Sequence, residues 1–161
     1  MTAAAVLAAL EARGLHLAVA ESLTGGLLAA EFVAVPGASR VFLGGVVAYH
    51  TGLKHSVLGV DASIINVHGA VHPDVAIQMA VRVREVLAVD GLPAQVGVAT
   101  TGVAGPDPQD GHPAGTVFIA VAIGGDARVV ELALRGGRNE IRRQVVVAAI
   151  GELAQRLDGL E

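Results

Sequence analysis

Tyr49 and Lys54 are the residues with the clearest chemical potential in this chain, because each is the only one of its type among 161 residues. The other ten Lys/Arg positions are all arginine, so a lysine is not needed here merely to supply a solvated charge. Arginine stays protonated at any working pH, whereas a desolvated lysine can lose its proton and act as a base. We therefore predict a proton-handling site at these two positions. The alternative is that Tyr49 ends a buried strand and Lys54 is an ordinary exposed helix charge.

A serine occupies a second position that favours chemistry. Residues 21–26, ESLTGG, lie between an expected strand and an expected helix, so Ser22 falls at the corner between them. A helix start has unpaired N–H groups, which here would belong to Thr24, Gly25 and Gly26 and could hold an anion or a carbonyl oxygen. A plain turn between a strand and a helix would have a similar composition, so both interpretations stay open.

A long loop and two arginines are further candidate binding residues. Residues 101–115 contain three prolines and four glycines, and a loop of this length inside a compact domain is usually functional. It holds neither a Walker lysine nor a GxGxxG sequence, so it predicts no P-loop or dinucleotide site. Arg138 and Arg142 share one face at the start of an expected helix, where cations oppose the helix dipole. Their placement indicates either a docked anion or pairing with acids such as Glu140.

The hydrophobic pattern predicts alternating helices and strands. Helices are expected at residues 2–13, 27–35, 61–67, 73–89 and 139–157, with a further short helix that has Lys54 in its first turn and ends at Gly59. Strands are expected at residues 15–20, 41–49, 95–101, 116–123 and 128–134. Gly44 and Gly45 indicate a bulge or a close backbone approach in the second strand. The last two strands are expected to form an antiparallel hairpin.

Composition limits the fold and the function classes. Apolar residues make up 53% of the chain and aromatic residues 2%, so the core must consist of Ala, Val, Leu and Ile. A net charge of −4 argues against a nucleic-acid partner, which needs a concentrated basic face. The absence of cysteine excludes disulfides, thiolate metal sites and a thiol nucleophile. The length predicts a single domain, residues 1–161.

Metal binding and membrane association are not expected. His68, His72 and Asp74 are typical metal ligands, but Gly69 breaks the helical spacing that would align the two imidazoles. The N-terminal sequence lacks the basic region and cleavage site of a signal peptide, and no apolar run reaches the roughly 18 to 20 residues of a membrane span. We therefore expect a soluble cytoplasmic protein with no metal. Its high content of Ala, Val and Leu suggests apolar surface that self-association could bury, and we therefore expect a homodimer or a larger assembly.

Six groups of residues follow one another along the chain: Glu21-Ser22-x-Thr24-Gly25-Gly26, Tyr49 with Lys54 and Leu58-Gly59-Val60, His68-Gly69-Ala70-Val71, Thr101-Gly102-Val103-Ala104-Gly105-Pro106, Pro113-x-Gly115-Thr116-Val117, and Gly136-x-Arg138-x-x-Ile141-Arg142. In this order they resemble the motifs of the CinA C-terminal domain family, whose members with known activity are nicotinamide-nucleotide amidases. The resemblance implies a three-layer α/β/α sandwich with a mixed β-sheet. It also implies hydrolysis of the carboxamide of nicotinamide mononucleotide to nicotinate mononucleotide and ammonia, without a cofactor. In this family the domain is often fused behind a larger domain, to which nothing here corresponds.

The resemblance further implies that Ser22, Tyr49 and Lys54 are catalytic. The hypothesis is that Ser22 attacks the carboxamide, the Lys54–Tyr49 pair moves protons, and N–H groups near residues 24–26 hold the oxyanion. The substrate phosphate is expected at Arg138 and Arg142 or at the loop residues Thr101, Gly102 and Gly105. In an alternative, Lys54 and Tyr49 activate a water molecule directly and Ser22 only orients the amide.

Five positions depart from the residues usual in the family: Leu23 replaces cysteine, Thr51 asparagine, His72 serine, His112 lysine and Gly137 aspartate. These changes favour a competing hypothesis, a nucleotide-binding module that keeps the fold and has lost turnover. The retained sole lysine and sole tyrosine favour the amidase. A third hypothesis is a Tyr/Lys oxidoreductase, but that class has a spacing of four rather than five and a glycine-rich dinucleotide loop.

Overall fold

A five-stranded mixed sheet lies at the centre of the molecule. The computed structural model describes residues 1–160. The strands are β1 (Leu17–Glu21), β2 (Phe42–Val47), β3 (Val96–Gly102), β4 (Thr116–Ile123) and β5 (Asp126–Ala133), in the spatial order β2-β1-β3-β4-β5. β1 runs parallel to both of its neighbours, whereas β3, β4 and β5 pair antiparallel. The predicted hairpin of the last two strands is confirmed.

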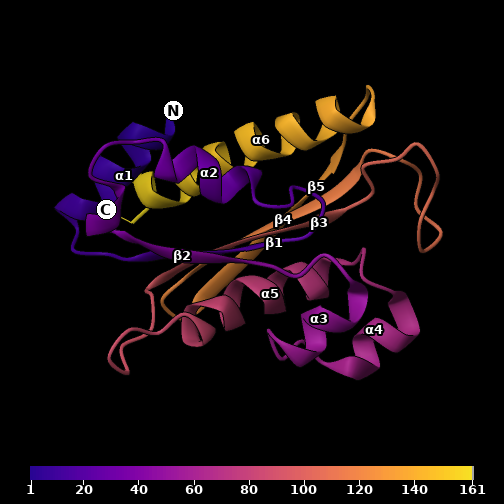
Figure 1. Ribbon diagram of the computed structural model, residues 1–161, viewed down its shortest axis with the longest axis horizontal. Helices are drawn as coiled ribbons and strands as arrows, with labels where there is room; N and C mark the ends of the chain where they lie inside the picture. Colours follow the sequence, from indigo (N-terminus) through magenta and orange to yellow (C-terminus); the bar gives the residue numbers. More distant parts are fainter. Residues whose placement is uncertain (161) are drawn as a thin grey trace.

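Helices cover both faces of this sheet (Figure 1). On one face lie α1 (Ala3–Ala12), α2 (Leu27–Val33) and α6 (Arg138–Asp158), and on the other α3 (Thr51–Ser56), α4 (Ala62–His68) and α5 (Pro73–Val86). The predicted three-layer α/β/α sandwich is therefore confirmed. None of the helices within residues 1–160 is both long enough and apolar enough to cross a membrane.

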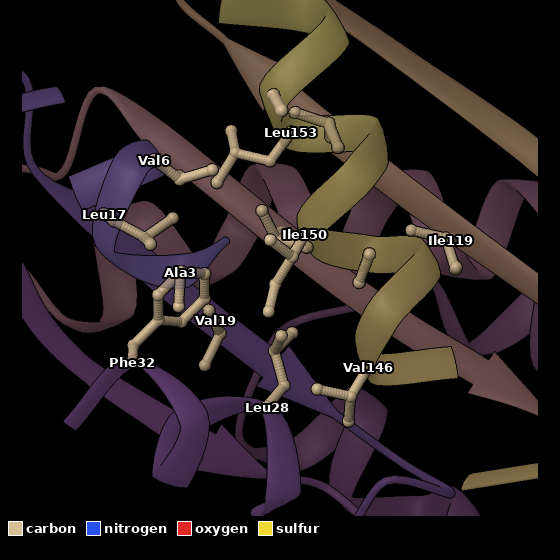
Figure 2. Close-up of a cluster of buried hydrophobic side chains, with 14 of the residues drawn as sticks. Ala3, Val6, Leu17, Val19, Leu28, Phe32, Ile119, Val146, Ile150 and Leu153 are labelled. Carbon is tan, nitrogen blue, oxygen red and sulfur yellow. The ribbon is translucent and has the colours of Figure 1, made fainter. Parts of the chain in front are cut away.

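Two hydrophobic clusters hold the layers together, one on each side of the sheet. Figure 2 shows the cluster under α1, α2 and α6, where aliphatic side chains surround Phe32. The second cluster lies between the sheet and α5 and contains Met79 and Val83. Both are built mainly from Ala, Val, Leu and Ile, as the composition predicts, and burial of such side chains is the main term that stabilises a domain of this size.

Small residues allow close approach at two points of the sheet. A side chain at Gly97 would place its Cβ 1.9 Å from the carbonyl oxygen of Ala80, so glycine lets α5 lie directly on β3. In β2 the register shifts next to Gly44, because Leu17 pairs with Phe42 whereas the following residue of β1 pairs with Gly44. This shift is an irregularity of the kind that the glycine pair predicts, and the expected close approach is also present, because a Cβ atom at Gly45 would lie 2.9 Å from Val19 Cγ2.

The helix boundaries differ from the sequence-based expectation at two places. α3 begins at Thr51, before Lys54, because the His50 imidazole accepts a hydrogen bond from the Gly52 N–H (3.1 Å) and caps the helix. α5 ends at Val86, before the expected boundary, and a short turn follows it. A 3-10 helix, η1 (Ala38–Arg40), was not predicted. α3 also ends at Ser56, before the expected Gly59, and Lys54 lies in its last turn rather than its first, with its side chain buried.

Candidate active site

The candidate site lies where the parallel strands β1 and β2 end. The N–H of Ala48 donates to the carbonyl oxygen of Glu21 (2.9 Å), and the N–H of Ser22 donates to that of Thr100 on β3 (3.0 Å). These bonds extend the sheet by one residue and bring Ser22 beside the segment that leads into α3. The strand-to-helix corner predicted for Ser22 is present, since α2 begins five residues later. Carboxyl ends of parallel strands are the usual ligand side of an α/β sheet.

The Lys54 amine lies inside the protein, against Ser22. The side chain is only 1% exposed. Its Nζ atom is 2.9 Å from the Ser22 hydroxyl oxygen, 2.7 Å from the carbonyl oxygen of Ala48 and 3.4 Å from that of Tyr49. The alternative of an exposed helix charge is therefore wrong. Ser22 is itself 8% exposed, so the two groups form a largely desolvated pair.

Burial changes the proton affinity of this lysine. Desolvation lowers the pKa of the Lys54 amine from 10.5 to about 8, although the negative charge of Asp110 acts in the opposite direction. At pH 7 roughly a tenth of the molecules would then carry a neutral amine, compared with about one in 3,000 at the ordinary pKa. A neutral amine has two N–H groups, which suit the two carbonyl oxygens, and one lone pair, which suits the Ser22 hydroxyl proton. The arrangement can therefore activate Ser22 as a nucleophile.

The Tyr49 phenol takes part in a different contact. The side chain is 57% exposed, and its hydroxyl oxygen accepts a hydrogen bond from Arg138 Nη2 (2.7 Å). Arg138 Nη1 donates to the carbonyl oxygen of Gly105 (2.7 Å), so this guanidinium links the end of β2 to the long loop after β3. Within residues 1–160 the phenol and the Lys54 amine form no hydrogen bond. Direct proton exchange between them stays a prediction, and a Tyr/Lys oxidoreductase gains no support from this geometry.

The carboxylate of Glu21, the last residue of β1, lies at the start of α2. This side chain is fully buried, and its carboxylate accepts hydrogen bonds from the N–H groups of Gly26 (3.1 Å), Leu28 (3.0 Å) and Ala29 (2.9 Å). The protein's own anion therefore fills the place that the sequence suggests for a ligand. Sequence reasoning missed this role, although an acid directly before a polar turn and a helix is the signal for it.

The remaining N–H groups of the turn differ in availability. The Gly25 N–H donates to the carbonyl oxygen of Ser22 (3.1 Å), so neither it nor that of Gly26 is free to hold an oxyanion. The N–H groups of Leu23 and Thr24 have no acceptor within the part of the chain that the structure describes. Of the donors expected at residues 24–26, only the Thr24 N–H lacks a partner within residues 1–160, as does the N–H of Leu23; both residues are buried (0% and 3% exposed), and oxyanion binding at this turn stays a prediction.

Arg142, on α6, donates hydrogen bonds to the backbone of the turn at residues 22–26. Its Nε donates to the carbonyl oxygen of Leu23 (2.9 Å), its Nη2 to that of Thr24 (3.1 Å) and its Nη1 to Asn139 Oδ1 (3.0 Å). All three guanidinium nitrogens already have partners, so Arg138 is the more available of the two arginines for a substrate anion. Among the described residues, neither arginine forms an ion pair with Glu140, which instead accepts a hydrogen bond from the Gly137 N–H.

The loop after β3 lies beside a second backbone turn. Thr101 is buried, and its hydroxyl donates to the carbonyl oxygen of Ala70 (2.8 Å), whereas Gly102 ends β3. Further along the loop, the Asp110 carboxylate accepts hydrogen bonds from the N–H groups of Ala70 (2.9 Å) and Val71 (3.3 Å). Of the loop residues predicted to bind substrate, Gly105 contacts Arg138, and Thr101 serves the backbone. Asp110 was not predicted to have a role.

Residues 1–157 match the sequence profile of the CinA C-terminal domain. This chain belongs to the CinA C-terminal domain family. A solved CinA superfamily protein from Klebsiella pneumoniae is 32% identical, with a TM-score of 0.91 over 98% of this chain and 96% of that one. The competence/damage inducible protein CihA from Agrobacterium tumefaciens is also 32% identical, with a TM-score of 0.86 over 97% and 93%.

Longer CinA relatives match at higher identity. A CinA-like protein of Frankia casuarinae is 47% identical over 156 residues, which cover 96% of this chain and 35% of the relative. A putative competence-damage inducible protein of Geobacillus kaustophilus is 47% identical over 134 residues, which cover 83% of this chain and 31% of the relative. The chain thus spans about a third of the length of these relatives, and the match concerns the CinA C-terminal domain alone.

The positions that depart from the usual CinA residues have local roles. Leu23 is buried in the core, and Thr51 is the first residue of α3. The His72 imidazole caps α5 by accepting from the Asp74 N–H (3.2 Å), and Gly137 precedes the first turn of α6. The fifth position, His112, pairs with Gln109 through backbone hydrogen bonds and lies edge-on to Phe118. None of the five residues interrupts the Ser22–Lys54 contact.

The histidines expected not to bind metal pack against each other. The rings of His68 and His72 stack with their centroids 4.3 Å apart and an interplanar angle of 17°. His72 Nδ1 is engaged by the cap of α5, so this nitrogen is not available to a metal ion. Residues 1–160 contain no group of three or more His, Cys, Asp or Glu side chains arranged to hold a metal ion.

Proposed function

We propose that this protein hydrolyses the carboxamide of nicotinamide mononucleotide to nicotinate mononucleotide and ammonia. The observation that carries the proposal is the 2.9 Å contact between Ser22 Oγ and the buried Lys54 Nζ, because amide hydrolysis needs a nucleophile and a base within hydrogen-bond reach. The choice of nicotinamide mononucleotide as the substrate rests on the resemblance to nicotinamide-nucleotide amidases. No metal or other cofactor is required by this chemistry.

The first half of the reaction forms an ester on Ser22. Neutral Lys54 accepts the hydroxyl proton as Ser22 Oγ attacks the carboxamide carbon, and the carbonyl oxygen becomes an oxyanion. The N–H groups of Leu23 and Thr24, which have no acceptor among the described residues, are the proposed donors to that oxyanion. The Lys54 ammonium then gives its proton to the amide nitrogen, the C–N bond breaks, and ammonia leaves.

The second half regenerates the enzyme. Lys54, again neutral, accepts a proton from water, the resulting hydroxide attacks the ester carbon, and the C–O bond to Ser22 breaks as the lysine returns the proton to the serine oxygen. The products are the free hydroxyl of Ser22 and nicotinic acid mononucleotide, whose carboxylic acid releases its proton to solvent to become the carboxylate. The carbonyl oxygens of Ala48 and Tyr49 keep the amine aimed at Ser22 in both protonation states.

Arg138 and the Tyr49 phenol are proposed to bind the substrate phosphate near the rim of the site. Arg138 is exposed and has no carboxylate partner within residues 1–160, so its charge is available to an anion. Thr101, Gly102 and Gly105 shape the adjacent loop. Thr24, Gly25, Gly26 and Arg142 contribute by fixing the turn that carries the oxyanion donors.

Ammonia release from nicotinamide mononucleotide tests the proposal. We expect turnover by the wild type, and a fall in kcat/KM of about 1,000-fold or more in Ser22→Ala and in Lys54→Arg. Lys54→Arg keeps the positive charge and removes the titration, so its failure would show that proton transfer matters. Ser56→Ala, on the exposed side of α3, is the matched control and should leave the rate unchanged. Tight binding without turnover by the wild type would instead indicate a nucleotide-binding module.

Trapping of the ester separates the two possible roles of Ser22. Mass spectrometry after acid quench of a reacting sample should detect an adduct of nicotinate mononucleotide on Ser22. If Lys54 activates water directly, no such adduct forms, and Ser22→Ala should retain a substantial part of the activity.

A further inference from the structure

Asp110 is built into the structure although nothing in the proposed reaction uses it. Its Oδ2 atom accepts hydrogen bonds from the N–H groups of Ala70 (2.9 Å) and Val71 (3.3 Å), residues about forty positions away in the chain. These two residues lie between α4 and α5, so the contact ties the loop after β3 to the turn that joins these helices. The hydroxyl of Thr101 holds the same turn through the carbonyl oxygen of Ala70 (2.8 Å).

The backbone on both sides is shaped for this contact. Asp110 has a φ of +52°, in the left-handed region that side chains rarely adopt. Gly69 has a φ of +76°, and a Cβ atom there would lie 2.4 Å from Asp110 Cγ. The turn hydrogen bonds between Gln109 and His112 close the loop around Asp110. Positive φ at both Asp110 and Gly111 (φ +78°) is the favoured geometry of a two-residue Asp-Gly turn, so this turn presents the Asp110 carboxylate to the Ala70 and Val71 N–H groups without strain.

The charge of Asp110 also reaches Lys54. Other titratable or charged groups stand on the surrounding elements: His50 and His55 beside Lys54, Glu21 next to Ser22, Arg138 beyond Tyr49, and His68 and His72 flanking the turn that Asp110 binds. The negative charge of Asp110 favours the protonated form of the Lys54 amine, and because Asp110 is an exposed residue, solvent screens part of this effect.

We propose that Asp110 is a positioning residue of this active site, which ties the loop after β3 to the Ala70–Val71 turn and holds a fixed negative charge toward Lys54. The inference rests on the proposed function for its catalytic meaning, but the tie and the charge are properties of the resting protein.

The charge has two opposing effects on the proposed reaction. It reduces the fraction of neutral Lys54 available to start catalysis at low pH. It also stabilises the ammonium that forms when Lys54 takes the Ser22 proton in a desolvated site. Removal of the charge should therefore extend activity to lower pH and reduce the maximal rate.

The single lysine allows the charge to be tested without any substrate. In protein labelled with [ε-13C]lysine, the one lysine signal reports the titration of Lys54 by NMR. We expect the signal to titrate at a lower pH in Asp110→Asn than in the wild type, because the asparagine oxygen can still accept from the two N–H groups and only the charge is lost. Asp107→Asn, an exposed residue of the same loop, is the matched control and should titrate as the wild type does. An unchanged titration in Asp110→Asn would overturn the proposal.

The hydrogen bonds from Ala70 and Val71 to Asp110 and the effect of Asp110 on the reaction rate are tested in separate experiments. Asp110→Ala should speed amide hydrogen exchange at Ala70 and Val71 relative to the wild type, and Asp110→Asn should not; equal exchange in all three proteins contradicts the tie. In Asp110→Asn the acidic limb of the kcat/KM–pH profile should move to lower pH while kcat falls several-fold, and an unmoved limb contradicts the catalytic role. A wild type without amidase activity would refute the proposed function, and the NMR experiments would still decide whether Asp110 acts on Lys54.

Discussion

The segment from Ala48 to Lys54 contributes one residue to each of two hydrogen-bonded pairs, and the two pairs lie in opposite environments. Lys54 turns inward to Ser22 and is almost completely buried, whereas Tyr49 turns outward to Arg138 and is more than half exposed. Both pairs have donor and acceptor atoms less than 3 Å apart, so distance does not distinguish them. Solvent does, because desolvation alters the proton affinity of an amine and water screens an exposed pair.

This difference suggests a division of roles. The buried pair is suited to proton transfer, since its lysine has a pKa of about 8. The exposed pair keeps a fully charged arginine at the rim and is suited to recognition of an anion. Three experiments test this division, in order of expected effect.

The cost of burying Lys54 should appear in the pH dependence of stability. The folded-state pKa of about 8 lies below the ordinary 10.5, so the unfolded chain binds more protons between these values and folding becomes more favourable as pH rises. The whole difference corresponds to about 3 kcal/mol. Urea denaturation of the wild type and Lys54→Met should show the wild type gaining up to this amount relative to the variant from pH 7.5 to 10.5. Parallel curves for the two proteins would mean that the lysine is not desolvated.

Arg138→Ala should weaken substrate binding and leave the chemistry largely intact. Loss of a hydrogen bond to a charged group costs about 1.5 to 3 kcal/mol, which predicts a KM about 10 to 100 times higher with kcat reduced much less. Steady-state kinetics with nicotinamide mononucleotide measures this split. Arg143→Ala, an exposed arginine of the same helix, should change neither constant. If kcat instead falls by the same factor as kcat/KM, Arg138 stabilises the transition state and not only the bound substrate.

Tyr49→Phe should have the smallest effect. The ring remains and only the oxygen that accepts from Arg138 is lost, so KM should rise about fivefold, as expected for one hydrogen bond of about 1 kcal/mol. We expect kcat to stay within about twofold of the wild type. If kcat instead falls by more than about 100-fold, the Tyr49 phenol transfers a proton itself, and the division between the two pairs is wrong.

Hydrophobic periodicity was sufficient to predict most of the architecture. The pattern of apolar residues located the helices and strands to within a few positions, because burial on one face of an element leaves a regular trace in the sequence. The glycine pair in β2 indicated the register shift, and α4 lies within one residue of the helix expected at residues 61–67. α3 was displaced because a histidine cap leaves a weaker trace than Ser, Thr, Asp or Asn.

The sequence by itself determined which residues were unusual, and the tertiary structure decided what each of them contacts. The single lysine among arginines marked Lys54 as a candidate functional residue, but the parallel pairing of β1 with β2 was needed to bring it to Ser22, 32 positions earlier. The contacts of Glu21, Arg142 and Asp110 could not be predicted from the sequence pattern, since each side chain binds backbone groups that folding brings within reach. Burial and hydrogen bonding are set by neighbours in space, and these two terms fix the proton affinity on which the proposed chemistry depends.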